Sequence, residues 1–260
     1  MKLIKSLLVI LMVLIFLIGA GVFLYPVLHG YLIDHRIQMK AEEFLSWVEI
    51  APYTPDPSAA EEADDISPDP TEPDTYTELW RDIRDYNQRL YAEGQVGLNS
   101  KLAYETPSFE LADYGLEDEI FAVISIPKLE IEMPVYLGAT YQHMADGAAL
   151  LSQTSIPIGT ENSNCIIAGH RGWSGASYFR YIDQLEPGDT VTITNLWEKL
   201  TYRVSEIQII EPYQVEQILI RPDQELITLL TCHPYASGGR QRYLVICERI
   251  ENEPRSEINH

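Results

Sequence analysis

Apolar residues are distributed unevenly along this chain. The longest apolar run extends from Ser6 to Tyr25 without a charged residue, and the next charge is Asp34. Roughly 20 apolar residues in a helix match the hydrocarbon thickness of a bilayer. A cleaved signal peptide is the alternative, but its apolar region usually has only about 7–15 residues and ends at a small-x-small site. The run therefore predicts an uncleaved transmembrane anchor within residues 1–30.

The charges around this run predict its orientation. Lys2 and Lys5 precede it, and the positive-inside rule keeps such an end in the cytoplasm. The chain beyond about residue 30 then lies outside the cell. We expect a single-pass protein of the cell membrane whose main domain is extracellular.

Residues 31–76 have the pattern of a juxtamembrane segment followed by a linker. Apolar residues at mixed helical spacing over residues 31–50 indicate a short helix. From Glu43 to Glu78 there is no Lys or Arg, and the stretch is rich in acidic residues and proline. Because such a segment cannot bury enough apolar surface to offset its chain entropy, we expect an extended, disordered spacer. Its charges and prolines would lift the domain from the membrane.

A helix is predicted from Thr77 to about Tyr91, and Gly94 and Gly97 end the pattern. Its apolar positions, spaced three and four residues apart, are Leu79, Ile83, Tyr86 and Leu90. The residues that follow are irregular. We assign residues 77–118 to this helix and to a segment long enough to form a lid.

From Ile120 onward, short apolar runs alternate with Gly, Pro, Asn and Asp. Regularly spaced short strands with turn signals are typical of an all-β barrel or sandwich. The predicted strands are Ile120–Ile126, Pro134–Tyr136, Asn164–Ala168, Thr190–Thr194, Thr201–Ile210, Leu226–Thr231 and Tyr243–Cys247. We expect a mainly β catalytic domain over residues 119–252 and a polar tail over residues 253–260.

Composition narrows the classes of function. The chain has 260 residues, 46% of them hydrophobic, which suffices for one globular domain with a full core. It has 18 Lys and Arg against 39 Asp and Glu, a formal net charge of -21. Phosphate contacts need clustered Lys and Arg, so the composition argues against a nucleic-acid partner.

The chain contains 3 cysteines, Cys165, Cys232 and Cys247. An odd, low number argues against a disulfide framework, and the absence of a Cys-x-x-Cys pair argues against structural zinc. Cys165 and Cys247 fall within apolar strands, so we expect buried thiols. A disulfide between them is the alternative, since an extracellular compartment permits one. We expect no cofactor and no dedicated metal site.

Two residues at strand ends are candidates for covalent chemistry. Cys232 follows a predicted strand and precedes Pro234, which cannot continue a central strand. Reactive groups are commonly presented at strand ends, although a lone Cys is more often a buried small hydrophobe. His170 lies between glycines at the end of another apolar strand and is placed to point into a cleft; a satisfied loop histidine is the alternative. His233 adjoins Cys232, but neighbours on an extended chain face opposite ways.

Arg240 and Arg242 open the last predicted strand and would share one face. They form either a solvated basic turn or a clamp on a substrate carbonyl beside the thiol. A Cys, a His and an Arg at three strand ends suffice for acyl transfer. The thiolate forms a thioester, the imidazole moves the proton of the leaving and incoming amines, and the arginine stabilises negative charge.

Three segments resemble motifs of the sortase family. Residues 228–232 read Thr-Leu-Leu-Thr-Cys, similar to the signature Thr-Leu-x-Thr-Cys. Residues 168–172 are similar to the family's Gly-His-Arg-Gly segment, and residues 242–245 to its Arg-Leu-Leu-Val segment. The resemblance covers roughly residues 80–250. It implies catalytic roles for His170, Cys232 and Arg242, with Arg240 as the alternative arginine, and we assign substrate contacts to Thr231, Arg240 and His233.

Further segments are most similar to class C, the pilin-polymerising sortases. They are Asp85-Tyr86-Asn87, Ile126-Pro127-Lys128, residues 133–136, residues 154–159 and residues 232–235. The resemblance implies an eight-stranded β-barrel with short helices on the outer face of a Gram-positive membrane. It implies cleavage of a Leu-Pro-x-Thr-Gly-like motif between Thr and Gly. The expected partners are surface proteins or pilins with this motif and an amine acceptor, a pilin lysine or a peptidoglycan precursor.

Two departures from class C leave the acceptor open. The Asp-Pro-aromatic motif of the class C lid does not occur in residues 98–102, which read Leu-Asn-Ser-Lys-Leu, and no C-terminal membrane segment is present. A sortase that anchors monomeric surface proteins to peptidoglycan is therefore an alternative to a pilin polymerase. A non-catalytic binding module and a hydrolytic cysteine protease are further alternatives.

Overall fold

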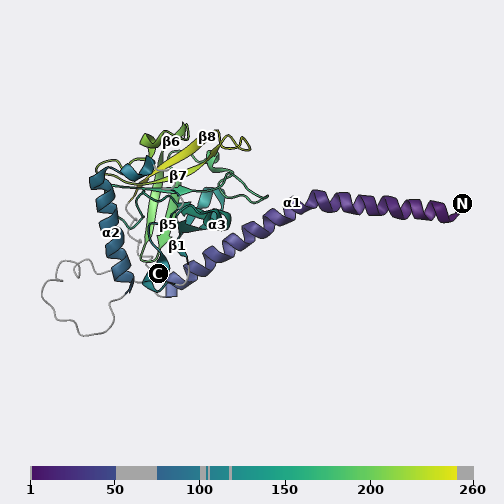
Figure 1. Cartoon of the computed structure of the whole chain (residues 1–260), viewed down its shortest axis with the longest axis horizontal. Coiled ribbons are helices and arrows are strands. Elements are labelled where there is room, and N and C mark those ends of the chain that lie inside the picture. The colour runs from purple at the N-terminus through teal and green to yellow at the C-terminus, as the bar shows by residue number, and fades with distance from the viewer. Residues whose placement is uncertain (1, 51–74, 100–103, 105, 117–118, 251–260) are drawn as a thin grey trace, which may run out of the picture.

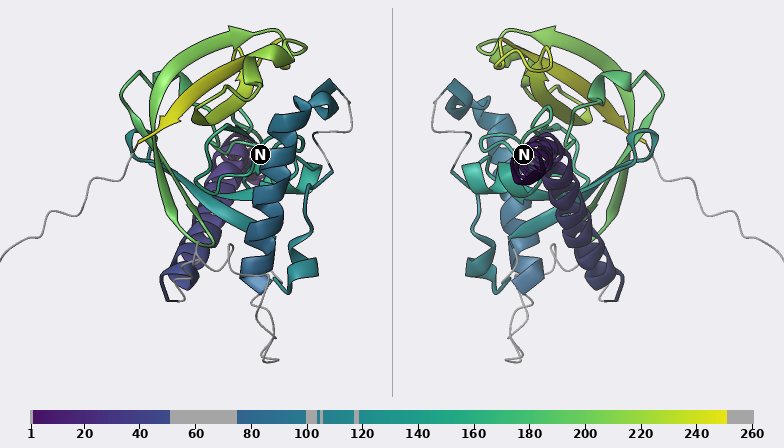
Figure 2. Two further views of the ribbon diagram at one scale, coloured as in Figure 1. Left: turned by 90° about the vertical axis from the view of Figure 1, so that its left-hand side faces the viewer. Right: turned by 90° about the vertical axis from the view of Figure 1, so that its right-hand side faces the viewer.

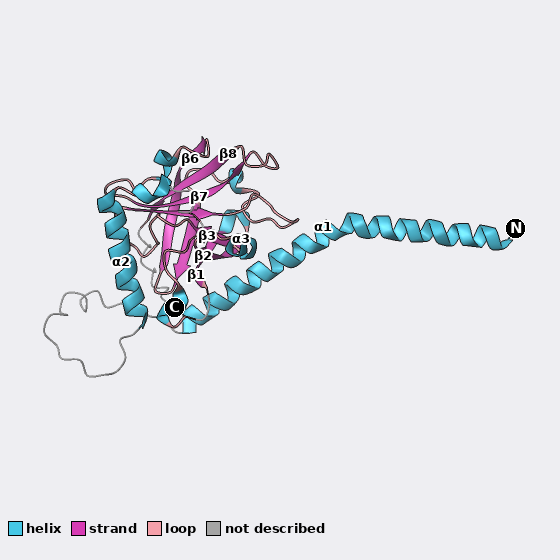
Figure 3. Ribbon diagram, viewed as in Figure 1, coloured by secondary structure: helices cyan, strands magenta, loops and turns pink. Residues whose placement is uncertain are grey.

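The computed structural model describes residues 2–50, 75–99, 104, 106–116 and 119–250. Eight strands close into a β-barrel, with helices on its outside (Figures 1 and 3). Around the barrel the order is β1-β2-β3-β4-β7-β8-β6-β5, and β5 pairs with β1 to close it. β2/β3 and β4/β7 pair in parallel, and the other neighbours are antiparallel. The expected eight-stranded barrel is confirmed.

The strands are β1 (Ile120–Ile126), β2 (Ile131–Leu137), β3 (Ala148–Leu150), β4 (Ser163–Ala168), β5 (Thr190–Asn195), β6 (Lys199–Ile210), β7 (Glu225–His233) and β8 (Gln241–Arg249). The α-helices are α1 (Lys2–Ile50), α2 (Thr75–Glu93) and α3 (Tyr141–Asp146). Short 3₁₀ turns are η2 (Val96–Asn99), η3 (Leu111–Tyr114), η4 (Pro127–Leu129), η5 (Ile182–Gln184) and η6 (Val215–Ile218). All seven predicted strands are present. The sequence does not reveal β3, because three residues are too few to show alternation.

The predicted helix is α2, two residues longer at each end. Its apolar stripe is buried against the barrel. Asn87 is buried as well, and its side-chain amide exchanges two hydrogen bonds of 2.9 Å with the backbone of Ile156. Tyr86 accepts a hydrogen bond from the backbone nitrogen of Gln153 at 3.1 Å. The two sequence segments that resemble class C, at residues 85–87 and 154–159, are therefore joined in space.

The juxtamembrane segment differs from the sequence prediction. Residues 31–50 are not a separate short helix, because α1 continues through them without a break. Their inward side chains are buried in the hydrophobic core, where α1 packs on β1 and β2 (Figure 2). These side chains are Ile33, Ile37, Ala41 and Phe44, with a helical spacing of three and four residues. This part of the helix belongs to the folded domain.

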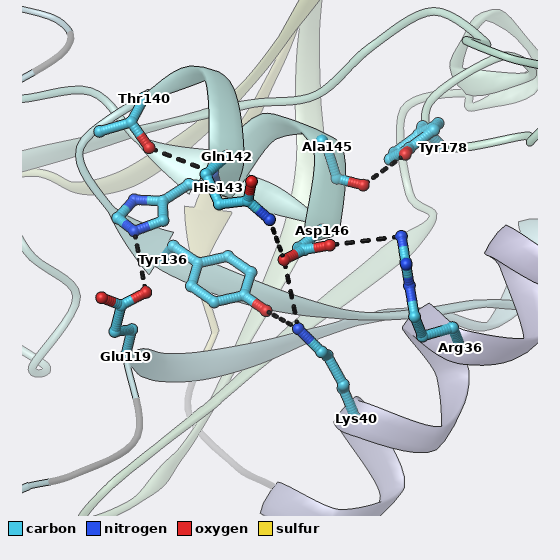
Figure 4. Close-up of polar contacts among 10 residues, drawn as sticks. All are labelled: Arg36, Lys40, Glu119, Tyr136, Thr140, Gln142, His143, Ala145, Asp146 and Tyr178. Atoms are coloured by element: carbon cyan, nitrogen blue, oxygen red, sulfur yellow. Dashed lines mark hydrogen bonds and ion pairs between the residues drawn. The ribbon is translucent and has the colours of Figure 1, made fainter.

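Ion pairs reinforce this packing of α1 on the barrel. Asp146, at the end of α3, forms ion pairs with Arg36 at 3.4 Å and with Lys40 at 3.3 Å (Figure 4). Asp34 accepts a 2.9 Å hydrogen bond from the backbone nitrogen of Ser177, in the loop that follows β4. The contact matters for the membrane prediction, because a spacer placed after Ile50 cannot lift a domain that α1 already holds.

The first half of α1 points away from the barrel and is exposed along its length (Figure 1). Within the described residues it is the one helix that is long and apolar enough to cross a membrane. Pro26 lies inside α1, where its missing N–H removes one backbone hydrogen bond. The predicted disordered spacer between Glu43 and Glu78 is helical at both ends, because α1 extends to Ile50 and α2 begins at Thr75. Its middle, residues 51–74, and the predicted polar tail lie outside the described residues.

Candidate active site

The alternation of side chains along β7 and β8 sets two of the candidate residues on one face. Ile227 and Leu229 point into the main core, so Leu230 and Cys232 point outward. Arg242 lies directly opposite Cys232 in the β7/β8 ladder. Directly opposed residues share a face of an antiparallel pair and are close enough to interact. Cys232 is exposed to solvent.

His170 reaches the same face from β4. Ala168 pairs with Leu230 as the last pair of the parallel β4/β7 ladder, and His170 and Cys232 each follow two residues later. Two hydrogen bonds extend the pairing. The nitrogen of Gly169 donates to the oxygen of Leu230 at 3.0 Å, and the Thr231 hydroxyl donates to the Gly169 oxygen at 2.7 Å. The structure thus brings His170, Cys232 and Arg242 together at adjacent strand ends.

Two aromatic rings hold the imidazole of His170. Trp173 stacks on it with centroids 5.4 Å apart, and Tyr178 meets it edge-on at 5.6 Å. Burial between these rings lowers the pKa of His170 from its ordinary value. In the described part of the chain no hydrogen bond joins this ring to the Cys232 sulfur. Burial of this half-buried ring favours its neutral form, which can take up a proton.

Gly239 allows the thiol and the guanidinium to approach each other. A Cβ at Gly239 would lie 3.2 Å from Cys232 Sγ and 3.3 Å from Arg242 Nη1. The backbone of Gly239 also has a φ of +79°, which side chains rarely adopt. Arg242 Nη1 donates to the Gly239 oxygen at 2.7 Å and to the Gln241 oxygen at 3.1 Å. Turn and strand together fix the guanidinium next to the sulfur.

Arg240 lies in a different position from Arg242. It precedes β8 in the turn and is exposed. Arg242 is half-buried, pairs with Cys232 in the ladder and shares the Gly239 contact. Of the two arginines considered from sequence, the geometry favours Arg242 as the partner of the thiol.

Thr231 and His233, for which substrate contacts are predicted, lie on the opposite face of β7 from Cys232. Thr231 is 1% exposed and uses its hydroxyl to tie β7 to the backbone that carries His170. His233 Nδ1 lies 2.9 Å from Arg171 Nη1, and its ring packs on Tyr243. Both residues support the strand ends. Their side chains point away from the face of Cys232, because alternate residues of β7 face the other way.

The remaining cysteines lie inside the barrel. Cys165 and Cys247 are free and buried, which confirms the expectation of core thiols and excludes the disulfide. Burial raises the pKa of both thiols well above the ordinary value, so neither is ionised near neutral pH. Among the described residues, no group of three His, Cys, Asp or Glu side chains is arranged to hold a metal ion.

An apolar patch on the outer face leads from the thiol across the barrel. It comprises Ile166 and Ala168 of β4, Leu230 of β7, Leu244 of β8, Ile210 of β6, and Ile218 and Leu219 beyond it. Leu98 packs on this patch and is 1% exposed, and Tyr104 packs beside it. Tyr104 also donates a 2.9 Å hydrogen bond to the Leu98 oxygen. Leu98 of η2 and Tyr104 therefore cover the outer-face patch.

Sequence reasoning missed the aromatic and arginine residues around His170. Trp173 and Tyr178 hold its ring, and Arg171 joins the loop to His233. Arg171 also binds Asp183 at 2.6 Å and packs over the ring of Tyr243. The signal for Arg171 was present in the Gly-His-Arg-Gly segment. Trp173 and Tyr178 lie in an irregular loop whose path no periodicity defines.

Comparisons with known proteins agree with this geometry. Residues 124–250 match the family model of the sortase domain. Sortase D of Bacillus subtilis is 25% identical over 130 residues, which cover 49% of this chain and 63% of that protein. The structure of sortase C-1 from Streptococcus pneumoniae is 30% identical, with a TM-score of 0.54, and the match covers 66% of this chain and 91% of that one.

Sortase C1 of GBS pilus island 1 is 27% identical, with a TM-score of 0.61, and its match covers 69% of this chain and 91% of that one. The chain spans between about half and two thirds of the length of the curated relatives that it matches. On the barrel topology, the outward Cys-His-Arg set and these matches, the chain belongs to the sortase family.

Proposed function

We propose that this chain is a membrane-anchored cysteine transpeptidase that cleaves a Leu-Pro-x-Thr-Gly-like motif between Thr and Gly. The observation that carries the proposal is the placement of Cys232, Arg242 and His170 on one outer face, at the ends of three adjacent strands. The proteins that the chain resembles are named as sortases, which supports the same reaction class.

In this mechanism Cys232 is the nucleophile. Its thiolate attacks the Thr carbonyl carbon, and the Thr–Gly amide bond breaks as a thioester forms. His170 takes the proton of the Cys232 thiol and gives it to the leaving amine; it then takes a proton from the incoming amine and returns it to the sulfur when the thioester is cleaved. Arg242 donates hydrogen bonds to the carbonyl oxygen while negative charge develops there. Nη1 donates to the Gly239 and Gln241 oxygens, which holds the guanidinium beside the thiol and leaves its other N–H groups for the carbonyl oxygen.

The outer-face patch is the floor on which the apolar residues of the donor lie. The patch includes Leu230, two residues before Cys232, and Ala168, two residues before His170. Leu98 covers this floor, so the segment after α2 acts as a lid that the donor displaces. The lid would be held by the burial of Leu98 rather than by an Asp-Pro-aromatic motif.

The first half of α1 is the membrane anchor, and the barrel lies on the extracellular side. Its apolar side chains are exposed, and transferring such a surface from water into the hydrocarbon of a bilayer lowers the free energy. Lys2 and Lys5 keep the N-terminus on the cytoplasmic side.

The acceptor is an amine, and we favour the lysine of a pilin subunit. The likeness to sortase C1 of GBS pilus island 1 supports this choice. The alternative acceptor is a peptidoglycan precursor, with monomeric surface proteins as donors. The sequence of residues 98–102, which lacks the class C lid motif, favours that alternative.

The reaction is tested with the full chain in detergent micelles and a fluorogenic Leu-Pro-x-Thr-Gly peptide. We expect peptide cleavage and a thioester adduct on the intact protein by mass spectrometry. Cys232→Ala abolishes both, whereas Cys165→Ala, a matched removal of a buried thiol, retains both. Cleavage that survives in Cys232→Ala would refute the mechanism.

The acceptor is tested separately, by adding a pilin subunit that carries its acceptor lysine. A polymerase gives covalent ladders in denaturing gels, and the ladders disappear when that lysine is replaced by arginine. Thioester formation without ladders, together with transfer to a peptidoglycan-derived amine, would establish the alternative.

A further inference from the structure

Arg180 lies between the two loops that carry the candidate catalytic residues. On one side its guanidinium packs against Gly172, two residues after His170, where a Cβ would lie 2.6 Å from Arg180 Nε. On the other side its Cζ lies 5.4 Å from the ring centroid of Tyr235, three residues after Cys232. Gly172 has a φ of +75°, so both its backbone and its lack of a side chain make room for this cation.

The charge of Arg180 has no carboxylate partner in the described part of the chain. Its Nη2 donates to the Ala176 oxygen at 3.2 Å, and its Nε is buried without a hydrogen-bond partner. The adjacent Arg171 differs, because it binds Asp183 at 2.6 Å. A partly buried cation is costly unless it is paired. In a chain with 39 acidic residues, an arginine left in this state points to a partner that comes from outside.

A cavity of about 480 Å³ adjoins this arginine. Its lining residues are Arg171, Arg180, Tyr181, Asp183, Gln184 and Tyr235. Asp183 is engaged by Arg171, so the positive charge that remains is that of Arg180. The cavity shares no residue with the outer-face patch, so it is separate from the surface on which we propose that the donor lies. Arg171 follows His170 and Tyr235 follows Cys232, so the cavity borders the loops of both candidate catalytic residues. An acceptor bound there would lie close to both loops.

We propose that this cavity is a carboxylate-binding subsite for the amine acceptor, with Arg180 as the residue that recognises the carboxylate. The inference rests on the proposed transpeptidase function. A guanidinium offers paired N–H donors that match a carboxylate, and such charge-assisted hydrogen bonds are the strong ones. The subsite selects acceptors in which a carboxylate lies a short distance from the attacking amine.

The test compares triglycine with triglycinamide as acceptors of the full-length enzyme in micelles. The two have the same primary amine and differ in the terminal carboxylate. We expect a KM for triglycine about tenfold lower, as one charge-assisted hydrogen bond allows. Arg180→Gln removes the difference between the two acceptors, and Arg180→Lys restores part of it. Arg203→Gln, which removes an exposed arginine from β6, keeps the preference.

Equal KM values for the two acceptors in the wild type, or a preference that survives Arg180→Gln, would overturn the subsite. Arg180→Gln raising both KM values equally would also overturn it, because that result indicates a structural role. Calorimetric binding of triglycine and triglycinamide to Cys232→Ala tests the same preference without turnover. Failure of thioester formation in the wild type therefore counts against the proposed function alone, while the binding preference decides the subsite.

Discussion

The inner and outer faces of β4, β7 and β8 carry different kinds of side chain on the same three strands. Inward positions in the middle of the strands are apolar and almost fully buried, with Cys165, Ile167, Leu229 and Cys247 among them. Outward positions form the outer-face patch and end in Cys232 and Arg242, while His170 follows the last outward residue of β4. Because side chains alternate along a strand, each of these strands places one set in the core, where it stabilises the fold, and the other set on the outer face, where the candidate catalytic residues lie.

The largest expected difference between the faces is in thiol reactivity. With a methanethiosulfonate reagent near neutral pH, we expect Cys232 to react at least about a thousandfold faster than Cys165 or Cys247. The buried thiols are 1% and 0% exposed and react only when the structure opens, which is rare in a stable domain. Mass spectrometry of the intact protein should show one adduct, and none in Cys232→Ala. A second adduct at a comparable rate would show that the barrel opens easily.

The next largest effect concerns neighbouring leucines of β7. Leu229 points inward and is fully buried, so Leu229→Ala should lower the free energy of unfolding by about 2–5 kcal/mol. Leu230 points outward and is half-buried, so Leu230→Ala should cost about 1 kcal/mol and raise the KM for the donor peptide. Chemical denaturation and peptide kinetics measure the two effects. The comparison fails if both variants change stability equally and leave KM unaltered.

A smaller effect is expected where α1 meets the loop after His170. A Cβ on Gly30 would overlap the backbone of Gly175 and lie 2.9 Å from the nitrogen of Ala176. Gly30→Ala should therefore destabilise the domain by about 1–3 kcal/mol and slow peptide cleavage, because the loop carries the rings that hold His170. A Cβ on Gly21 would have nothing within 4 Å, so Gly21→Ala is the matched control. Equal melting temperatures in micelles would contradict the contact.

The smallest effect is a pH dependence from His170. Burial lowers its pKa in the folded protein, so between the folded and the ordinary value the unfolded chain binds more protons. Acidification through this range, from the ordinary value of about 6.5 downward, therefore favours unfolding. Wild type should lose more stability than His170→Gln between about pH 7 and pH 5 in denaturant titrations. Equal losses of unfolding free energy in the two proteins would show that His170 does not contribute to the pH dependence of stability.

Much of the barrel could be predicted from the sequence, because period-two alternation and turn residues mark the longer strands. The burial of Cys165 and Cys247 followed from their place in apolar runs. The register that sets Cys232 opposite Arg242 and the parallel pairing of β4 with β7 depend on long-range contacts, which no local pattern encodes.

The same limit explains what was missed around the site. No local pattern around Gly30 or Asp34 indicates that they contact the loop after His170, more than 140 residues later in the sequence. Arg180 is one arginine in an irregular stretch, and only the fold places it against Gly172 and Tyr235. Side chains that act through tertiary contacts are therefore found by geometry and not by pattern.

The unbroken course of α1 has a consequence for where the enzyme works. Its apolar half ends at Tyr25, and Gly30, little more than one helical turn later, already touches the loop that follows His170. Ile33 and Ile37 of α1 are buried in the hydrophobic core, so the barrel is held rigidly against the helix whose first half is apolar. Under the proposed anchoring by α1, the thiol would work at a nearly constant height above the bilayer. A donor would have to bring its cleavage motif to that height, which would make the spacing between motif and membrane part of the recognition.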